Sequence, residues 1–293
     1  MSRIAYVNGR YVPHRDAAVH IEDRGYQFAD GVYEVIAVWN GRPVDLAGHM
    51  ERLETGLREL RIPVPMSRSV LAHILRETVR RNRVMYGIVY LQISRGTAPR
   101  VHTWSQTIQP SMVVTARPMP GIRKEVMEEG VRVISVEDIR WKRRDLKTVG
   151  LLPNAMAKQK AHEAGCYEVF QVDGEGMVTE AGASNAWIVD QEGRLVTRPL
   201  GNEILPGITR ATLLDIARAN GIEVEERAFS LEEAKKARES FVSGTTAFVT
   251  PVVQIDDAVL GNGKPGSVAT RLRALYFDYL NTIPADAWSH VAA

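Results

Sequence analysis

Residues 143–161 read RRDLKTVGLLPNAMAKQKA, a stretch that changes from basic to apolar and back to basic. Lys147 lies at this change with leucines and a valine close by in the sequence, so we expect its amine to enter an apolar cleft where desolvation favours the neutral form. A neutral lysine amine is a nucleophile towards aldehydes. The alternative is a structural lysine that is paired with Asp145. The local sequence leaves both roles open.

The neighbouring lysines are expected to be solvated charges. Lys158 and Lys160 lie in NAMAKQKAHEAG, which reads as a helix ended by Gly165. A lysine on such a helix usually keeps its ammonium in water. Lys142 lies in a basic run and is expected at the surface. Lys147 is therefore the one lysine of this region for which we predict a chemical role.

The composition is that of an ordinary globular protein. The chain has 293 residues, of which 45% are hydrophobic and 25% charged, and we expect two domains. The net charge of +2 gives no reason to expect nucleic acid or a membrane as partner. Cys166 is the only cysteine, which excludes an intrachain disulfide framework, and we recognise no signal peptide. We therefore expect a cytoplasmic protein.

Hydrophobic patterning predicts an α+β fold. Asn8-Gly9 and Asn40-Gly41 are typical of β-hairpin turns. Apolar residues at spacings of four and three over residues 46–60 predict an amphipathic helix. Later segments alternate between strand patterns, helix patterns and glycine turns.

A domain boundary is predicted where proline and glycine are dense, in RPMPGIRK at residues 117–124. We expect an N-terminal α+β domain at 1–117, a linker at 118–123, and a C-terminal α+β domain at 124–293 that carries Lys147. The sequence shows no internal repeat.

Two short stretches suit a phosphate group. LPGITR at 205–210 places Gly207 at an expected helix start, where backbone amides can bind an anion, and SGTT at 243–246 offers two hydroxyls beside a glycine. The alternative for each stretch is an ordinary helix start or turn. GNGKPG at 261–266 is interpreted as a turn, because Pro265 does not suit a dinucleotide-binding loop. We find no metal site. An amine nucleophile with candidate phosphate sites indicates a cofactor that combines an aldehyde with a phosphate, as pyridoxal 5′-phosphate does.

Further motifs follow one another along nearly the whole chain. They are EDRGYQFADGVYEV, HMERL, YLQISRGTAPRVH, VTEAGASN, ILPGITR and SGTTAFVTPV. Together with the lysine stretch they resemble the fold-type IV pyridoxal-phosphate enzymes, and most of all the D-amino acid aminotransferases. The resemblance implies a two-domain α+β enzyme whose active site lies at the domain interface.

The resemblance also implies roles for individual residues. Lys147 would form the Schiff base with the cofactor, and Glu180 would lie beside the pyridine nitrogen and keep it protonated. The remaining residues with an implied cofactor contact are Arg52, Ser184, Leu205, Ile208, Thr209 and Thr245. The residues with an implied substrate contact are Tyr33, Tyr90, Arg100, His102 and Thr246. Pro99 favours an extended backbone, so Arg100 and His102 are expected to point to one side and to bind the α-carboxylate.

The function implied is ping-pong transfer of an amino group between a D-amino acid, D-alanine or D-glutamate, and a 2-oxo acid, 2-oxoglutarate or pyruvate. A homodimer is also implied. The alternatives are a branched-chain L-amino acid aminotransferase or aminodeoxychorismate lyase of the same fold, and a non-catalytic binding module. Two positions depart from the pattern: AGASN supplies fewer hydroxyls after Glu180, and Phe248 stands where a glutamate is common.

Overall fold

The computed structural model describes residues 3–121 and 124–291, which belong to two compact units. The first unit contains Met1–Gly121, Leu146–Gly150 and Leu280–Ala293, and the second contains Ile122–Asp145 and Leu151–Tyr279. The predicted continuous domain at 124–293 therefore differs from the structure, because Lys147 and the C-terminal segment belong to the first unit. Of the predicted linker at 118–123, residues 122 and 123 lie outside the described residues.

The first unit is built on a six-stranded antiparallel sheet with the order β2-β1-β6-β5-β3-β4. Both predicted hairpin turns are present, with Asn8, Gly9, Asn40 and Gly41 all at positive φ. The strands are β1 (Ile4–Val7), β2 (Arg10–Pro13), β3 (Gly31–Trp39), β4 (Arg42–Pro43), β5 (Gly87–Ser94) and β6 (Ser111–Pro118). The helices are η1 (His14–Asp16), α1 (Arg24–Phe28), α2 (Leu46–Glu59), α3 (Arg68–Arg81) and η2 (Ala287–Ser289).

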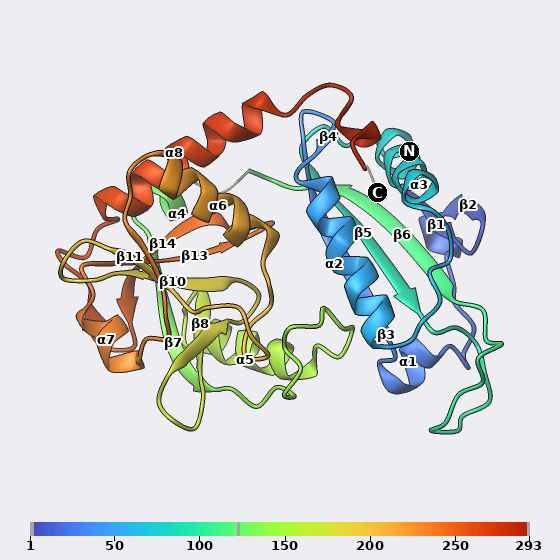
Figure 1. Ribbon diagram of the computed structural model, residues 1–293, viewed down its shortest axis with the longest axis horizontal. Coiled ribbons are helices and arrows are strands. Elements are labelled where there is room, and N and C mark those ends of the chain that lie inside the picture. Colours follow the sequence, from blue (N-terminus) through green and yellow to red (C-terminus); the bar gives the residue numbers. More distant parts are fainter. Residues whose placement is uncertain (1–2, 122–123, 292–293) are drawn as a thin grey trace. The chain divides into compact units, whose positions relative to one another are not determined.

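Helices α2 and α3 cover this sheet (Figure 1). The predicted apolar stripe of α2 is buried at Leu46, Met50, Leu53 and Leu57, and it forms one core with the apolar residues of β3, β5 and β6. The hydrophobic spacing in the sequence thus predicted both the position of α2 and the face of this helix that packs on the sheet.

The second unit is built on a nine-stranded mixed sheet with the order β12-β11-β10-β13-β14-β7-β8-β9, and β15 pairs with β14. The strands are β7 (Val131–Glu137), β8 (Glu168–Val172), β9 (Val178–Ala181), β10 (Asn185–Val189), β11 (Leu195–Thr197), β12 (Val224–Glu226), β13 (Glu239–Gly244), β14 (Phe248–Ile255) and β15 (Ala258–Val259). The helices are α4 (Lys124–Glu128), α5 (Leu152–Glu163), α6 (Ile208–Ala219), α7 (Leu231–Lys236) and α8 (Ser267–Thr282).

The segment GNGKPG lies between β15 and α8 and includes a turn. The Glu239 carboxylate accepts hydrogen bonds from the backbone N–H groups of Val268 (3.1 Å) and Ala269 (2.9 Å) at the start of α8. A negative charge of the chain itself therefore occupies this helix terminus, which agrees with the interpretation of GNGKPG as a turn rather than a phosphate loop.

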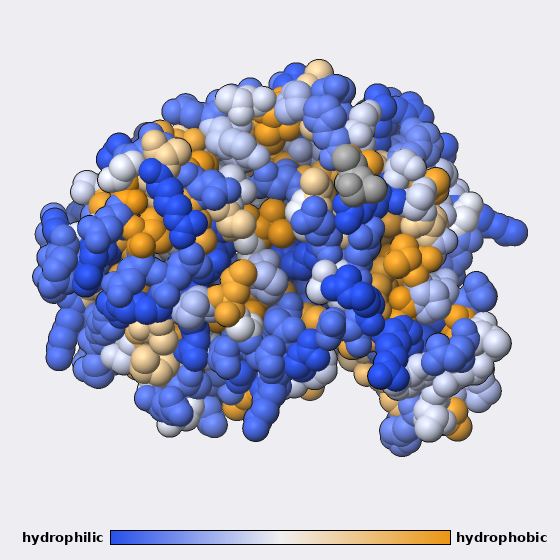
Figure 2. Space-filling view, viewed as in Figure 1, coloured by the Kyte–Doolittle hydropathy of each residue, from blue (hydrophilic) through white to orange (hydrophobic). Residues whose placement is uncertain are grey.

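The face of the molecule in Figure 2 is mostly polar. Figure 2 shows hydrophilic residues over most of the face it presents, with smaller apolar areas between them. Among the helices of the described residues, none combines the length and the apolar character needed to span a bilayer.

Candidate active site

Lys147 is placed by a short segment that runs beside β3. The backbone N–H of Tyr33 donates to the carbonyl of Lys147 (3.0 Å), and that of Val149 donates to the carbonyl of Gly31 (3.1 Å). This pairing brings the Lys147 ammonium to 4.2 Å from the centroid of the Tyr33 ring. The Asp145 carboxylate, the alternative partner of Lys147, is bound by Arg143 (Nη2–Oδ2 2.9 Å).

Of the two lysines of α5 that were predicted to be solvated, Lys160 is exposed, whereas Lys158 is paired with protein groups. Lys158 Nζ donates to the carbonyl of Tyr167 (2.8 Å) and lies 3.1 Å from a Glu168 oxygen, and Lys160 is exposed. Lys147 is thus the lysine of this region that lies against an aromatic ring of the predicted substrate site.

Tyr33 and Tyr90 lie side by side on β3 and β5, with ring centroids 5.7 Å apart. The Tyr90 hydroxyl donates to Gln92 Oε1 (2.7 Å). Burial, together with the nearby Tyr33, raises the pKa of Tyr90 to about 12. Tyr90 is therefore a neutral phenol at physiological pH. Three of the candidate site residues, Lys147, Tyr33 and Tyr90, thus lie next to one another in the first unit.

Arg52 is fixed by a buried carboxylate rather than solvated. Its Nε and Nη2 each donate to one oxygen of Glu34 at 2.7 Å, and His49, one turn earlier on α2, lies 2.7 Å from the same carboxylate. Burial alone would raise the pKa of Glu34, but the charge and hydrogen bonds of Arg52, with His49, lower it to about 2. Burial lowers the pKa of His49. The sequence analysis missed Glu34 and His49, although the three-residue spacing of His49 and Arg52 puts both on one helix face.

Glu34→Gln is expected to reduce the free energy of unfolding at pH 7 by about 3–5 kcal/mol, because it leaves the buried Arg52 without its counter-charge. The folded pKa of Glu34, about 2, lies below its ordinary value of 4.5, so its contribution is present above pH 4.5 and is lost as the pH falls towards 2. Urea unfolding at pH 7 and pH 3 measures this. In the matched control, Glu54→Gln, a more exposed pair with Arg68 is broken, and a loss of about 1 kcal/mol or less is expected. Equal losses in the two variants would contradict the argument.

In the second unit, Glu180 is held as an anion by three donors. Its Oε1 accepts from Arg140 Nη1, and its Oε2 accepts from Asn185 Nδ2 (3.3 Å) and from the backbone N–H of Leu205 (3.2 Å). Arg140 is in turn bound by the buried Asp138 (2.7 Å). Hydrogen bonds of this kind favour a charged carboxylate. The sequence analysis assigned no role to Arg140 or Asn185, and only the fold reveals these contacts.

The two predicted phosphate-binding stretches, 205–210 and 243–246, contain Gly207 and Gly244. Helix α6 begins at Ile208 without a side-chain cap, and a Cβ at Gly207 would lie 2.0 Å from Asn185 Oδ1, so the chain needs glycine there. A Cβ at Gly244 would lie 3.5 Å from the Ser184 side chain, which places Ser184 next to the stretch that continues into Thr245 and Thr246. Ser184 Oγ is buried and has no hydrogen-bond partner among the described residues.

Phe248, the second departure from the family pattern, opens β14 with a positive φ of 49°. Its ring lies 5.6 Å from that of Phe277 and 6.1 Å from that of Tyr276. A bulky residue at positive φ is uncommon. In this conformation the Phe248 ring packs against the rings of Tyr276 and Phe277.

Arg100 and His102 lie on the loop between β5 and β6 and are exposed. The Arg100 guanidinium lies 5.3 Å from the centroid of the Phe28 ring, and the His102 ring lies 5.6 Å from it. Both side chains thus lie beside one ring. The described residues contain no group of side chains suited to a metal ion.

Comparison with known proteins identifies similar sequences. The family model for amino-transferase class IV matches residues 31–255. A D-alanine aminotransferase from Bacillus licheniformis is 40% identical over 91% of this chain and 93% of its own length. A D-alanine aminotransferase from Listeria monocytogenes is 39% identical over 93% of this chain and 94% of its own.

Solved structures with a similar fold include branched-chain amino acid aminotransferases. The enzyme from Escherichia coli has a TM-score of 0.88 at 27% identity and covers 96% of this chain and 95% of its own. The enzyme from Thermoproteus uzoniensis, solved with norvaline, has a TM-score of 0.87 at 30% identity and covers 99% and 98%. A third branched-chain enzyme, from T.th., was solved with pyridoxamine 5′-phosphate and has a TM-score of 0.86 at 25% identity, with coverage of 99% and 97%.

Proposed function

The chain belongs to the amino-transferase class IV family, and from this membership we propose that it transfers the amino group of a D-amino acid, D-alanine or D-glutamate, to 2-oxoglutarate or pyruvate. The observation that carries this choice is the high identity to D-alanine aminotransferases over more than nine-tenths of the chain. The branched-chain L-amino acid aminotransferases are the second candidate, because solved structures with a similar fold include branched-chain enzymes. Membership in a family of enzymes leaves no support for a non-catalytic binding module.

We propose pyridoxal 5′-phosphate as the cofactor, and the residues present fit it. Glu180 offers an oriented anion for a protonated ring nitrogen. The buried Ser184 Oγ and the uncapped start of α6 at Ile208 and Thr209 offer hydrogen-bond donors for a phosphate. We assign Arg52, Leu205 and Thr245 to the same cofactor, Arg52 and Thr245 to its phosphate and Leu205 to its ring.

The bound cofactor would supply an aldehyde that condenses with amines and a ring that accepts electrons from the substrate Cα. Lys147 Nζ holds the cofactor before substrate arrives and then moves the proton at the substrate Cα. Glu180 holds a proton on the ring nitrogen, because its own donors keep it negatively charged. Tyr33, Arg100 and His102 bind the substrate α-carboxylate, and Tyr90 and Thr246 complete the substrate site. With the substrate amine tied to the cofactor, fixing the carboxylate on one side would leave only one enantiomer with its Cα hydrogen directed at Lys147.

We further propose a cytoplasmic homodimer. Ile21, which precedes α1, and Tyr26 on α1 are 77% and 78% exposed, and Val101 on the loop between β5 and β6 is 52% exposed. Exposed apolar side chains of this size are suited to burial against a second copy of the chain. Cys166 is a free thiol, which suits a reducing compartment.

The proposed function is tested by a panel of half-reactions. The purified protein loaded with the cofactor is mixed with D-alanine, D-glutamate, L-alanine and L-leucine in turn, and the cofactor absorbance and the chirality of the products are measured. We expect reaction with the D-amino acids and little with L-leucine. A preference for L-leucine would support the branched-chain alternative instead.

Arg100→Ala is expected to raise KM for D-alanine by about 10- to 100-fold with a smaller effect on kcat, since it removes a charge-assisted hydrogen bond to the carboxylate. Steady-state kinetics with D-alanine measure it. Arg15→Ala, which removes another exposed arginine of the first unit, is the control and is expected to leave KM unchanged. An unchanged KM in Arg100→Ala would remove this residue from the substrate site.

A further inference from the structure

The loop that carries Arg100 and His102 is closed at its base. Gly96 has a φ of 108°, and a Cβ there would lie 1.9 Å from the carbonyl oxygen of Gln109. Only glycine allows the two ends of the loop to approach this closely. Residues 96–109 therefore leave the sheet and return to it at one point, as in a compact Ω-loop.

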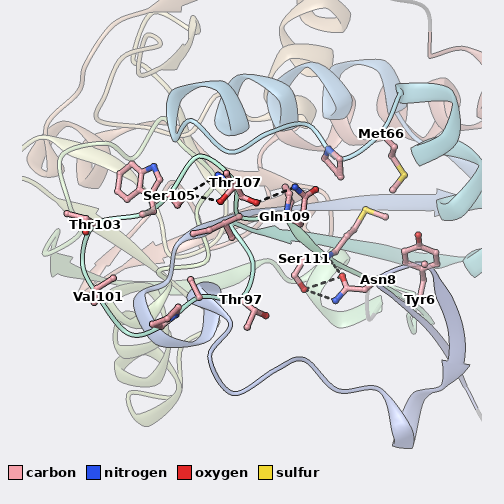
Figure 3. A pocket seen from close by; sticks show the side chains of 18 residues that line it. Tyr6, Asn8, Met66, Thr97, Val101, Thr103, Ser105, Thr107, Gln109 and Ser111 are labelled. Carbon is pink, nitrogen blue, oxygen red and sulfur yellow. Dashed lines mark hydrogen bonds between the residues drawn. The ribbon is translucent and has the colours of Figure 1, made fainter.

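A cavity of about 930 Å³ borders this loop. Figure 3 shows Val101, Thr103, Ser105 and Thr107 among the residues that surround it. Because this part of the loop borders open space instead of packed side chains, its position depends on specific anchoring contacts.

Arg24 supplies those contacts at three points. Its Nη1 donates to the carbonyl of Val101 (2.7 Å) and its Nη2 to the carbonyl of His102 (3.2 Å). Its backbone N–H donates to the carbonyl of Gly96 (2.9 Å). Arg24 is 2% exposed, so these bonds form away from bulk water, where losing them is costly.

The Arg24 guanidinium is itself held in place. Its Nε donates to Asp30 Oδ2 (2.8 Å), and it lies 4.6 Å from the centroid of the Phe28 ring, the ring that Arg100 and His102 also contact. Asp30 also binds Arg95, whose other donors reach the carbonyls of Leu60 and Arg61. The Arg95 guanidinium lies 4.0 Å from the centroid of the Trp104 ring, so Arg95 contacts a side chain of the loop but not the carbonyls of Val101 and His102. One carboxylate thus orients two buried arginines, of which Arg24 reaches the backbone of the substrate-binding loop.

We propose that Arg24 is the positioning residue for carboxylate recognition. By fixing the carbonyls of Val101 and His102, it sets the direction in which the Arg100 and His102 side chains leave the loop. It does not itself touch the substrate. The inference rests on the proposed role of Arg100 and His102 in binding the substrate α-carboxylate.

The test compares Arg24→Lys with the matched control Arg95→Lys. Both variants keep a cation beside Asp30, and Arg95→Lys also keeps a cation for the Trp104 ring, but Arg24→Lys loses the paired hydrogen bonds to the loop carbonyls. For each, kcat and KM are measured with D-alanine, and the inhibition constant is measured for propionate, which carries the carboxylate of D-alanine without its amine. Arg24→Lys is expected to raise KM and the propionate constant by about 10- to 100-fold with kcat changed less than about 3-fold. Arg95→Lys is expected to lower the melting temperature while leaving both constants unchanged.

An unchanged KM and propionate constant in folded Arg24→Lys, or an equal rise in Arg95→Lys, would overturn the proposal. If Arg24→Lys does not fold, Phe28→Leu decides, because this half-buried side chain contacts Arg24, Arg100 and His102 together. A rise in the propionate constant supports the proposal and an unchanged constant overturns it. Failure of the wild-type protein to react with either D-alanine or D-glutamate would instead overturn the proposed function.

Discussion

Lys147→Ala is expected to lower kcat/KM for D-alanine by about 10⁴-fold, since one amine serves both as nucleophile and as the group that moves the substrate Cα proton. The structure supports this choice because Lys147 lies 4.2 Å from the Tyr33 ring centroid, beside a predicted carboxylate contact. Stopped-flow measurement of the half-reaction with D-alanine gives the rate. Borohydride reduction of the wild-type protein loaded with the cofactor, followed by peptide mapping, gives the labelled lysine.

Lys158→Ala and Lys160→Ala are the controls. Lys158 is bound to Tyr167 and Glu168, and Lys160 is exposed, so neither change removes a group of the proposed site. Both variants are expected to react with D-alanine at the wild-type rate. A phosphopyridoxyl label on a lysine other than Lys147 would show that the assignment is wrong.

Local patterns predicted the elements of the first unit well. The Asn-Gly turns and the stripe of α2 depend on neighbouring residues, and the structure has both as predicted. The place of Lys147 was not predictable in this way. Residues 146–150 pair with β3, which lies far earlier in the chain, and no local signal reports a pairing between distant segments.

The buried polar partners of the site were equally hidden from the sequence. Glu34 and His49 surround Arg52 because β3 and α2 pack with a particular register, and Arg140 reaches Glu180 from beyond the end of β7. A charged residue in a sequence is usually a solvated one, so only the fold distinguishes these. Arg52 and Glu180 were proposed as site residues because their motifs resemble those of the family. The groups that hold these two side chains in place were found only in the structure.

Glu180→Gln is expected to slow proton abstraction from D-alanine by about 10²- to 10³-fold while leaving cofactor affinity within a few-fold. Arg140, Asn185 and the Leu205 N–H all donate to this carboxylate, so a neutral amide both loses the charge and directs its own N–H₂ at a donor. A neutral side chain no longer holds a proton on the ring nitrogen, which weakens electron withdrawal from the substrate Cα.

The rate is measured as loss of label from Cα-deuterated D-alanine, and affinity is measured by titrating the apoprotein with the cofactor. Glu168→Gln is the matched control, because Glu168 is 4% exposed and Glu180 is 6% exposed, and both are carboxylates of the second unit that are paired with a cation. Losing the bond to Lys158 is expected to lower the stability of the control without slowing exchange. If Glu180→Gln exchanged the label as fast as the wild type, the charge on Glu180 would have no part in activating Cα. If both variants slowed exchange alike, the effect would come from general damage to the unit rather than from a carboxylate at the ring nitrogen.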